Sequence, residues 1–303
     1  MHTTVQTPEF DAIVIGGSYA GLSAATQLAR ARKRVLVIDA GQRRNRFARH
    51  SHGFLSRDGA EASAIAATAR EQLLQYPTVS WAEGTAAQAQ AAGDGFAVTL
   101  IDGASYLGRR LVLATGMRDE LPPIEGLPER WGRSVFHCPY CHGYELDAGA
   151  IGVLAVGPLS MHHALMLPDW GRVTFFLNGA FEPDQDQLAA LAARDVTLER
   201  TGIARVQGEA EVVLQDGRVL PMAGLFVATQ MHVASPIAAQ LGCEMEEGPM
   251  GAFVRTDAMK ASSVPGVFCA GDMARPAGNV AFAVADGAMA GVAAHRSLIP
   301  GLV

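Results

Sequence analysis

The sequence predicts an α/β protein in which a second domain is inserted into the first. Apolar runs bounded by glycines alternate with alanine-rich helical patterns, which is typical of parallel strands buried on both faces. The 303 residues correspond to about two domains at ~150 residues each. Composition changes at residues 121–126 and at residues 230–235, and we interpret these two stretches as the crossings between the domains.

The first strand-helix-strand unit is predicted near the N-terminus. Residues 12–15 and 35–38 are short apolar runs, and each is expected to be a buried strand. Residues 23–30 between them are expected to form the helix that connects these parallel strands. A longer helix is predicted over residues 60–75, ending before a proline.

Two further regions follow along the chain. In residues 79–113, glycine-containing turns at 93–95 and 102–103 predict short strands in a meander of hairpins. A second strand-helix-strand unit begins with the apolar residues 151–156 and reaches another strand at 173–177. This unit is expected to belong to a second, smaller domain.

The last section of the chain is predicted to return to the first domain. From about Leu241 it contains a strand at residues 267–270 and a long alanine-rich helix at residues 280–297. It has too little apolar material to form a core of its own, so we expect it to complete the first domain.

A glycine-rich turn follows the first strand and has the arrangement of a dinucleotide site. The turn is Gly16-Gly17-Ser18-Tyr19-Ala20-Gly21, and Asp39 ends the next strand about twenty residues further on. Gly16 permits the tight turn, the small Ser18 lets the backbone approach a pyrophosphate, and Gly21 allows close packing of helix and strand. The helix N-terminus supplies N–H groups to phosphates, and Asp39 can accept hydrogen bonds from ribose hydroxyls. A glycine-rich packing turn is the structural alternative.

Four arginines follow Asp39 in the sequence: Arg43, Arg44, Arg46 and Arg49. Arginines at this place suit a 2′-phosphate, but the carboxylate of Asp39 argues against that ligand. We therefore expect a solvated basic loop over the cofactor.

Composition and charge exclude several classes of function. The 24 Lys and Arg residues stand against 30 Asp and Glu residues, a net charge of -6, so the field of the protein would repel nucleic acid. Four cysteines do not suggest a secreted disulfide framework, and the start of the chain shows no secretory signal, so a cytoplasmic location is expected. The uncharged residues 148–168 have the length of a membrane span, but glycine, proline and histidine interrupt them, and strand-turn-helix is the preferred interpretation.

A pair of cysteines separated by two residues is the chemical centre of the sequence. Cys138-Pro139-Tyr140-Cys141 can close a small disulfide ring, and a thiol with a lowered pKa is a nucleophile near neutral pH. His142 follows the pair and can take and give a proton near neutral pH. It is therefore the candidate general acid-base group, with His137 in reserve.

Three other interpretations of these cysteines compete with a redox role. Zinc needs four ligands, and Cys243 and Cys269 are isolated singles, so no metal site is expected. The pattern Cys-x-x-Cys-His also attaches c-type haem, but that attachment goes with export, and no export signal is visible. A purely structural pair is the third interpretation, and for Cys243 and Cys269 a structural role is preferred.

Further motifs give the chain a family resemblance. Leu113-Ala114-Thr115-Gly116 ends one strand, and the segment ending in Ala270-Gly271-Asp272 closes another with an acid. Together with the glycine turn and the CPYC pair, in this order, they cover nearly the full length of the chain. The sequence resembles the flavin-dependent disulfide oxidoreductases of the low-molecular-weight thioredoxin reductase family. The resemblance implies two Rossmann-like, three-layer ββα nucleotide-binding domains, relative rotation of these domains, and a homodimer.

The resemblance also implies roles for domains and residues. Residues 1–117 and 236–303 would form the FAD-binding domain, and residues 118–235 an NAD(P)H-binding-like domain that carries the CxxC pair. Cys141 would face the flavin, Cys138 would exchange with the incoming thiol, and Asp272 would bind the ribityl chain, with Asn279 and Val280 at the flavin ring. The implied cofactor-binding residues are Gly16, Ser18, Tyr19, Ala20, Gly21, Asp39, Arg46, His52, Ala114, Thr115, Gly116, Asp272, Asn279 and Val280.

The second nucleotide turn departs from the family pattern. It is Gly157-Pro158-Leu159-Ser160-Met161-His162, with Leu where the backbone must approach phosphate and His where the helix packs closely. Residues 177–182, after the next strand, contain no arginine for a 2′-phosphate. We expect this site to be lost or strongly weakened, so NADPH binding is doubtful.

That departure favours one subgroup of the family. The sequence is similar to flavin dithiol oxidases that close disulfides in small natural products such as gliotoxin and holomycin and can use oxygen to reoxidise the flavin. The similarity rests on the CxxCH form, on residues 45–47, and on residues 52–55 with 58–59. The first hypothesis is an FAD-dependent dithiol oxidase. The alternatives are an NADPH-dependent thioredoxin reductase and a non-enzymatic flavin redox sensor. The expected partner is a small-molecule dithiol or disulfide, or a thioredoxin-like protein. Neither nucleic acid nor a membrane is expected as a partner.

Overall fold

The computed structural model describes residues 9–302, and contacts divide the chain into two compact units. The first unit contains the chain up to Arg44, Ser63–Arg118 and the chain from Met231 onwards. The second unit contains Asn45–Ala62 and Asp119–Gln230. Residues 1–8, where we expect no secretory signal, lie outside the described part.

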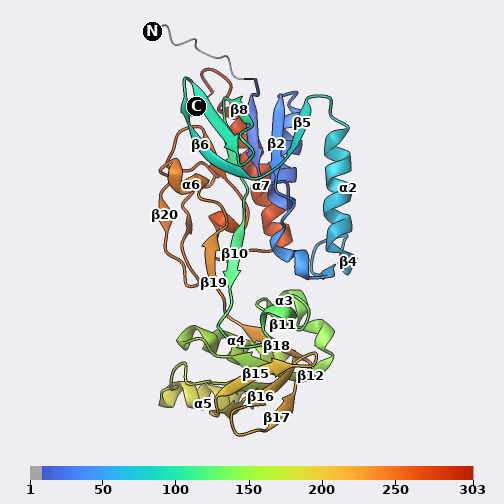
Figure 1. Ribbon diagram of the computed structural model, residues 1–303, viewed down its shortest axis with the longest axis vertical. Coiled ribbons are helices and arrows are strands. Elements are labelled where there is room, and N and C mark those ends of the chain that lie inside the picture. The colour runs from blue at the N-terminus through green and yellow to red at the C-terminus, as the bar shows by residue number, and fades with distance from the viewer. Residues whose placement is uncertain (1–8, 303) are drawn as a thin grey trace. The chain divides into compact units, whose positions relative to one another are not determined.

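The first unit is built around a five-stranded parallel sheet (Figure 1). Ile13 and Ile15 of the central strand enter one hydrophobic core, and Ala12 and Val14 enter another. Because both faces are buried, this strand is an unbroken apolar run rather than an alternating one. The strands, in sheet order, are β22 (Val267–Cys269), β9 (Leu111–Leu113), β1 (Ala12–Ile15), β2 (Val35–Asp39) and β5 (Val79–Glu83).

Three helices contribute to the core that Ala12 and Val14 enter. They are α1 (Tyr19–Arg30), α2 (Ala62–Leu74) and α7 (Val280–Arg296). Helices α1 and α7 approach closely because glycines face backbone: a Cβ at Gly287 would lie 2.0 Å from the Ala20 carbonyl oxygen. The first helix begins four residues earlier than its predicted residue 23, since the glycine turn itself leads directly into it.

An antiparallel sheet and one short helix contribute to the opposite core. They are β6 (Ala86–Ala92), β7 (Gly95–Leu100), β8 (Ser105–Gly108) and α6 (Ile237–Gln240). The predicted meander over residues 79–113 is therefore correct only for β6 to β8. The strands at its two ends, β5 and β9, belong to the parallel sheet, and β9 pairs with β1 and β22 instead of with a hairpin neighbour.

The second unit repeats this plan with its own five-stranded parallel sheet. Val153 and Phe175 enter one core with α4 (Met161–Met166) and α5 (Gln185–Ala193). Leu154 and Phe176 enter the other core with the antiparallel strands β15 (Ile203–Gln207), β16 (Glu211–Leu214) and β17 (Val219–Pro221). The order of the parallel strands is β11 (Val135–Phe136), β18 (Gly224–Val227), β12 (Ala148–Leu154), β13 (Gly171–Phe176) and β14 (Thr197–Glu199).

Both units thus have the predicted three layers, with helices on one face of a parallel sheet and an antiparallel sheet on the other. The chain passes between the units through β10 (Met117–Glu120) and β19 (Gln230–Val233), which pair with each other. Two short pairs complete the strands: β3 (His50–Ser51) with β4 (Ala60–Glu61), and β20 (Met245–Glu246) with β21 (Phe253–Val254).

Residues 148–168 form strand β12, the single-turn helices η4 (Pro158–Ser160) and η5 (Leu167–Asp169), and helix α4 between these turns. The expected strand-turn-helix is confirmed. Across residues 9–302, no helix combines the length and the apolar character that a membrane span needs.

Candidate functional site

The glycine turn after β1 is closed by contacts that leave no room for side chains. Gly16 has a φ of 107°, and a Cβ there would lie 2.2 Å from the carbonyl oxygen of Ala114. A Cβ at Gly21 would lie 1.7 Å from the carbonyl oxygen of Gly16. Ser18 has extended backbone and is the N-cap of α1. The first turn of α1 is thereby held against the carboxyl end of the parallel sheet, where a dinucleotide phosphate binds in such folds.

Asp39 at the end of β2 lies beside this turn. Its Oδ1 accepts a hydrogen bond of 3.1 Å from the backbone N–H of Gly17. The indole ring of Trp81, on the neighbouring strand β5, also lies close to Gly17. Its Nε1 is buried without a hydrogen-bond partner, which is uncommon for an indole N–H. Sequence reasoning missed Trp81, and only the pairing of β2 with β5 brings it to the site.

The two strand-end motifs meet at the same edge of the sheet. The backbone N–H and the Oγ1 of Thr115 each lie 3.3 Å from the Sδ of Met273, the residue after Asp272. Asp272 forms an ion pair of 2.8 Å with Arg44, and the side chain of Arg44 is only 15% exposed. The expectation of a solvated loop is therefore wrong for Arg44, because a carboxylate from the far end of the chain binds its guanidinium.

The start of α7 is fixed by its cap and by a buried carboxylate. The Asn279 side chain accepts a hydrogen bond of 2.8 Å from the N–H of Phe282, so Asn279 caps the helix and Val280 is its first residue. Further along α7, Asp286 is almost fully buried and forms ion pairs with Arg275 and Lys260. These pairs tie the segments on both sides of β22 to α7, and sequence reasoning did not find them.

The cysteine pair forms a disulfide at the start of the short helix α3 (Pro139–His142) in the second unit. Cys138 is the extended N-cap residue of this helix, and the Cα atoms of Cys138 and Cys141 are 5.3 Å apart. Tyr140 between them is 74% exposed and packs edge-on against Trp170. The pair is therefore carried by a local turn with an aromatic side chain directed to solvent, a geometry that suits exchange with an incoming thiol.

His142 is packed in a way that changes its proton affinity. Its ring stacks on Phe136 with a centroid distance of 4.3 Å. Burial, and secondly the charge of His52, lower the pKa of His142 to about 4. His142 is therefore neutral at pH 7, so it can accept a proton there but carries none to donate at the outset.

Two residues implied to bind the cofactor lie in Asn45–Ala62, the segment grouped with the second unit. The Nδ1 of His52 is 3.2 Å from a carboxylate oxygen of Glu145, which follows the CxxCH motif. The guanidinium of Arg46 lies 4.3 Å above the ring of Phe47. The structure thus brings His52 together with the redox segment, and the other implied cofactor residues lie in the first unit.

At the second nucleotide turn, after β12, a serine side chain binds a backbone N–H of the turn. The Oγ of Ser160 accepts a hydrogen bond of 3.0 Å from the backbone N–H of Val156, and Ser160 is fully buried. Leu159 is 40% exposed at the turn. The helix that follows, α4, has only six residues. The N–H of Val156 at this turn is therefore committed to a side chain of the protein.

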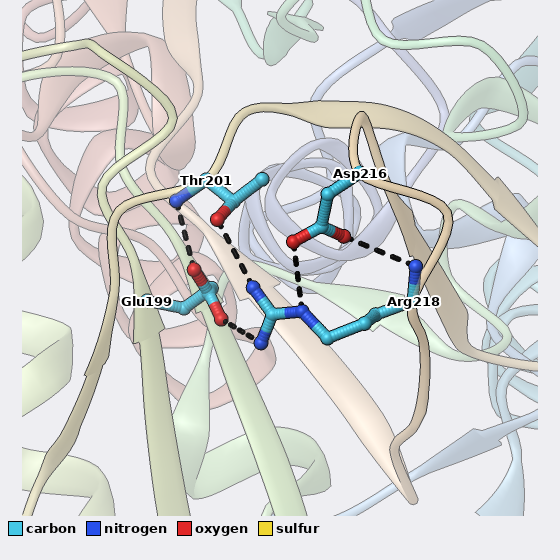
Figure 2. A network of polar contacts seen from close by, with 4 residues as sticks. All are labelled: Glu199, Thr201, Asp216 and Arg218. Carbon is cyan, nitrogen blue, oxygen red and sulfur yellow. Dashed lines mark hydrogen bonds and ion pairs between the residues drawn. The ribbon is translucent and has the colours of Figure 1, made fainter.

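Strand β14, which pairs with β13, ends in a polar network (Figure 2). Arg218 donates hydrogen bonds to Glu199, Asp216 and Thr201. The hydrogen bond from Arg218, followed by one from the backbone of Thr201, lowers the pKa of Glu199 to about 2. The charge of this arginine is thus matched within the protein. The side-chain oxygen of Asn178, two residues after β13, accepts a hydrogen bond of 2.8 Å from the N–H of Ile203.

The described residues contain no group of three or more His, Cys, Asp or Glu side chains that could hold a metal ion. The motifs predicted from the sequence instead gather in two places: the glycine turn, Asp39, Thr115, Asp272 and Asn279 in the first unit, and Cys138, Cys141 and His142 in the second.

Comparisons with known proteins agree on the family to which this chain is similar. A family model described as "Pyridine nucleotide-disulphide oxidoreductase" matches residues 10–290. The thioredoxin reductase tcpT of Claviceps purpurea (strain 20.1) is 33% identical over 96% of this chain and 95% of its own length.

Two solved structures are similar over nearly the whole chain. An oxidoreductase from Agrobacterium tumefaciens has 58% identity and a TM-score of 0.93, covering 95% of this chain and 98% of that one. The crystal structure of HlmI has 36% identity and a TM-score of 0.88, covering 97% of this chain and 94% of that one.

Proposed function

Because the chain belongs to the pyridine nucleotide-disulphide oxidoreductase family, we propose that it is an FAD-dependent dithiol oxidase. Cys138 and Cys141 would oxidise a dithiol substrate to a disulfide, and oxygen would accept the electrons. The second nucleotide turn carries this proposal, because Ser160 binds the Val156 N–H and Leu159 occupies the sequence position at which the backbone of the family pattern approaches phosphate. A reductase fed by NADPH would need that turn.

Residues of the first unit support FAD as the cofactor. Gly16 and Gly21 make a turn that any side chain would fill, and the carboxylate of Asp39 and the indole ring of Trp81 lie beside it. Asp272, at the end of β22, is a further acid at the same sheet edge. When bound, FAD supplies an acceptor for two electrons that oxygen can reoxidise.

The chain's own chemistry is thiol-disulfide exchange. One thiolate of the substrate attacks the Sγ of Cys138, a mixed disulfide forms, and Cys141 leaves as a thiolate. The second substrate thiolate attacks the substrate sulfur of that mixed disulfide. The product leaves with its own disulfide, and the protein retains two thiols with the two electrons of the substrate. We assign the exchange to Cys138 because the family resemblance implies it.

His142 would act as the base in this exchange. A thiol must lose its proton before it attacks, and a neutral imidazole next to Cys141 accepts it. The pKa of about 4 keeps His142 neutral and ready at pH 7. The exposed Tyr140 and Tyr144 border the pair and offer apolar surface to a small substrate.

The family resemblance further supports a homodimer in the cytoplasm. The partner would be a small dithiol or a thioredoxin-like protein. The second candidate function is an NADPH-dependent thioredoxin reductase, which the name of the relative tcpT favours.

Anaerobic flavin spectroscopy tests the proposal. Dithiothreitol, NADH and NADPH are added separately to the purified flavoprotein, and the loss of the oxidised flavin absorbance is followed. We expect bleaching by the dithiol alone, followed by recovery in air. Rapid bleaching by NADPH with none by the dithiol would instead assign the reductase function, and bleaching by no donor would leave a redox sensor as the better account.

Two cysteine variants test whether electrons from the dithiol reach the flavin through Cys138. Cys138→Ser should retain the flavin and lose bleaching by dithiothreitol, because the thiol that receives the substrate is gone. Cys243→Ser is the matched control, since this cysteine lies in the first unit outside the CxxC pair, and it should bleach as the unmodified protein does. Equal bleaching by all three proteins would show direct reduction of the flavin and contradict the proposed route.

A further inference from the structure

Two cysteines outside the CxxC pair lie together in the core of the first unit. Cys243 follows helix α6, and Cys269 is the last residue of β22. Both are buried members of the same hydrophobic core, and both are free thiols. One segment contacts both: the backbone N–H of Cys269 donates to the Lys260 carbonyl at 2.9 Å, and the Sγ of Cys243 lies 3.6 Å from the Oγ of Ser262. The sequence treats them as isolated singles, but the fold makes them a pair.

A cavity lies next to Ser262, the residue that contacts the thiol of Cys243. The Sγ of Cys243 is 3.6 Å from the Oγ of Ser262, and Ser262 lines a cavity of about 250 Å³. The other lining residues are mostly polar and include Glu244, Arg255 and Asp257. A space of this size holds several water-sized molecules. A small polar oxidant can therefore reach the serine that contacts the Cys243 thiol, whereas a bulky dithiol substrate cannot reach the buried sulfur.

The two thiols differ in proton affinity. The hydrogen bond from Cys269 lowers the pKa of Cys243 to about 7, and Ser262 lowers it further against the effect of burial. The hydrogen bond with Cys243 and then burial raise the pKa of Cys269 well above 9.0. Cys243 is thus the thiol that is partly ionised near neutral pH, and Cys269 is its protonated neighbour.

We propose that Cys243 and Cys269 form a second, peroxide-sensitive dithiol site, in which Cys243 is the attacking and Cys269 the resolving cysteine. The Sγ of Cys243 attacks one oxygen of hydrogen peroxide, an S–O bond forms, the O–O bond breaks, and water is released after protonation. The Sγ of Cys269 then attacks the sulfenic sulfur, the S–O bond breaks, a disulfide forms, and a second water leaves. Two thiols lose two protons and two electrons, and the peroxide is reduced to two water molecules.

This site does not depend on the dithiol oxidase proposal, because peroxide from any source would react there. Its position nevertheless places it in the cofactor unit. Cys269 directly precedes Ala270-Gly271-Asp272, the strand end that carries the acid paired with Arg44. A disulfide would fasten this strand end to the segment after α6.

Peptide mapping of the flavoprotein tests the proposal. The protein is reduced, freed of reductant, exposed to hydrogen peroxide at pH 7, alkylated and digested with trypsin. Trypsin places Cys243 in peptide 219–255, Cys269 in peptide 261–296 and both active-site cysteines in peptide 134–172. We expect a reducible cross-link between peptides 219–255 and 261–296 that forms separately from the Cys138–Cys141 disulfide. Complete alkylation of both thiols after the peroxide treatment would overturn the proposal.

Single variants test the order of attack. In Cys269→Ser the sulfenic acid on Cys243 has no resolving thiol, so dimedone should trap it. In Cys243→Ser the remaining Cys269 should react at least about 10-fold more slowly, because the thiolate fraction controls the rate. Equal reactivity of the two single cysteines, or dimedone labelling of Cys269 alone, would refute the assigned roles. Circular dichroism of both variants verifies that the substitution of a buried thiol leaves the fold intact.

Discussion

Asp286 offers a test of how the end of the chain holds the candidate cofactor site. Its carboxylate is 4% exposed and lies 2.9 Å from the Nζ of Lys260. It also accepts two hydrogen bonds from Arg275, of which the longer is 3.1 Å. Asp286→Asn keeps the size of the side chain but removes its charge, so two cations then face a neutral amide.

The expected cost follows from the burial of the three groups. Breaking a buried ion pair by removing one partner costs about 3–5 kcal/mol. The side chains of Arg275 and Lys260 are 29% and 15% exposed, so water can partly solvate their charges in the variant. We therefore expect a loss of about 3 kcal/mol in the free energy of unfolding. With an m-value of about 3 kcal/mol/M, the urea midpoint falls by about 1 M.

The pKa of Asp286 also predicts how this stabilisation changes with pH. Burial alone would raise the pKa of Asp286, but the hydrogen bonds from Arg275 and Lys260 outweigh burial and hold its pKa below 3.8. The stabilisation is thus fully present above pH 3.8, the value in the unfolded chain, and is lost as the pH falls through the lower folded pKa. The difference between Asp286→Asn and the unmodified protein should therefore shrink in acid.

Urea unfolding followed by circular dichroism and by flavin release measures both effects. Asp216→Asn is the matched control, because this aspartate pairs with Arg218 at the surface of the second unit and no measurable change is expected there (Figure 2). If Asp286→Asn unfolds at the same urea concentration as the unmodified protein at pH 7, the buried pair does not hold the strand end and the reasoning fails.

Four further predictions concern the sites themselves. Gly21→Ala should weaken FAD binding about 10- to 100-fold in a fluorescence titration, because its Cβ meets the Gly16 carbonyl and α1 must shift; unchanged affinity would contradict the turn. His142→Phe, which preserves the stacking on Phe136, should lower dithiol turnover by about 10²–10⁴-fold. The unmodified enzyme should lose half of its turnover at about pH 4, as His142 with its pKa of about 4 becomes protonated, and a profile that stays flat through pH 4 would exclude His142 as the base. Leu159→Gly should still show no flavin bleaching by NADPH, since Ser160 continues to bind the Val156 N–H; bleaching in that variant would mean that Leu159 alone blocks the site.

The parts of the fold that the sequence predicted are those with local causes. Strand β1, the glycine turn, α1 and β2 follow one another within Ala12 to Asp39, and each is encoded by its own apolar run or glycine. Strand β5 was misplaced in a meander because it is an edge strand with one neighbour, so its sequence Val-Ser-Trp-Ala-Glu lacks the apolar run of a central strand. Its partner β2 lies 40 residues away, and such pairing leaves no local signal.

The same distinction separates the candidate site residues. CPYC and the degenerate second turn are visible in the sequence because spacing and residue type alone define them. The pairing of Arg44 with Asp272 joins residues 228 positions apart, and Trp81 reaches Gly17 only through the sheet. The low pKa of His142 is equally invisible, since it comes from burial and not from the residue type.

Burial also explains how one chain can hold two dithiols with different chemistry. The CxxC pair lies at the start of a four-residue helix, with the exposed Tyr140 between the cysteines and the exposed Tyr144 after them, so a substrate with two thiols can approach it. Cys243 is only 6% exposed and Cys269 is fully buried, and the nearby cavity of about 250 Å³ is lined by Ser262, which contacts Cys243. Exchange with a bulky dithiol requires in-line approach to a sulfur, which the core prevents, whereas peroxide needs no more room than two water molecules. The size of the reactant, more than the reactivity of the thiols, therefore separates the two couples: electrons from a substrate enter at Cys138, and Cys243 responds only to small oxidants.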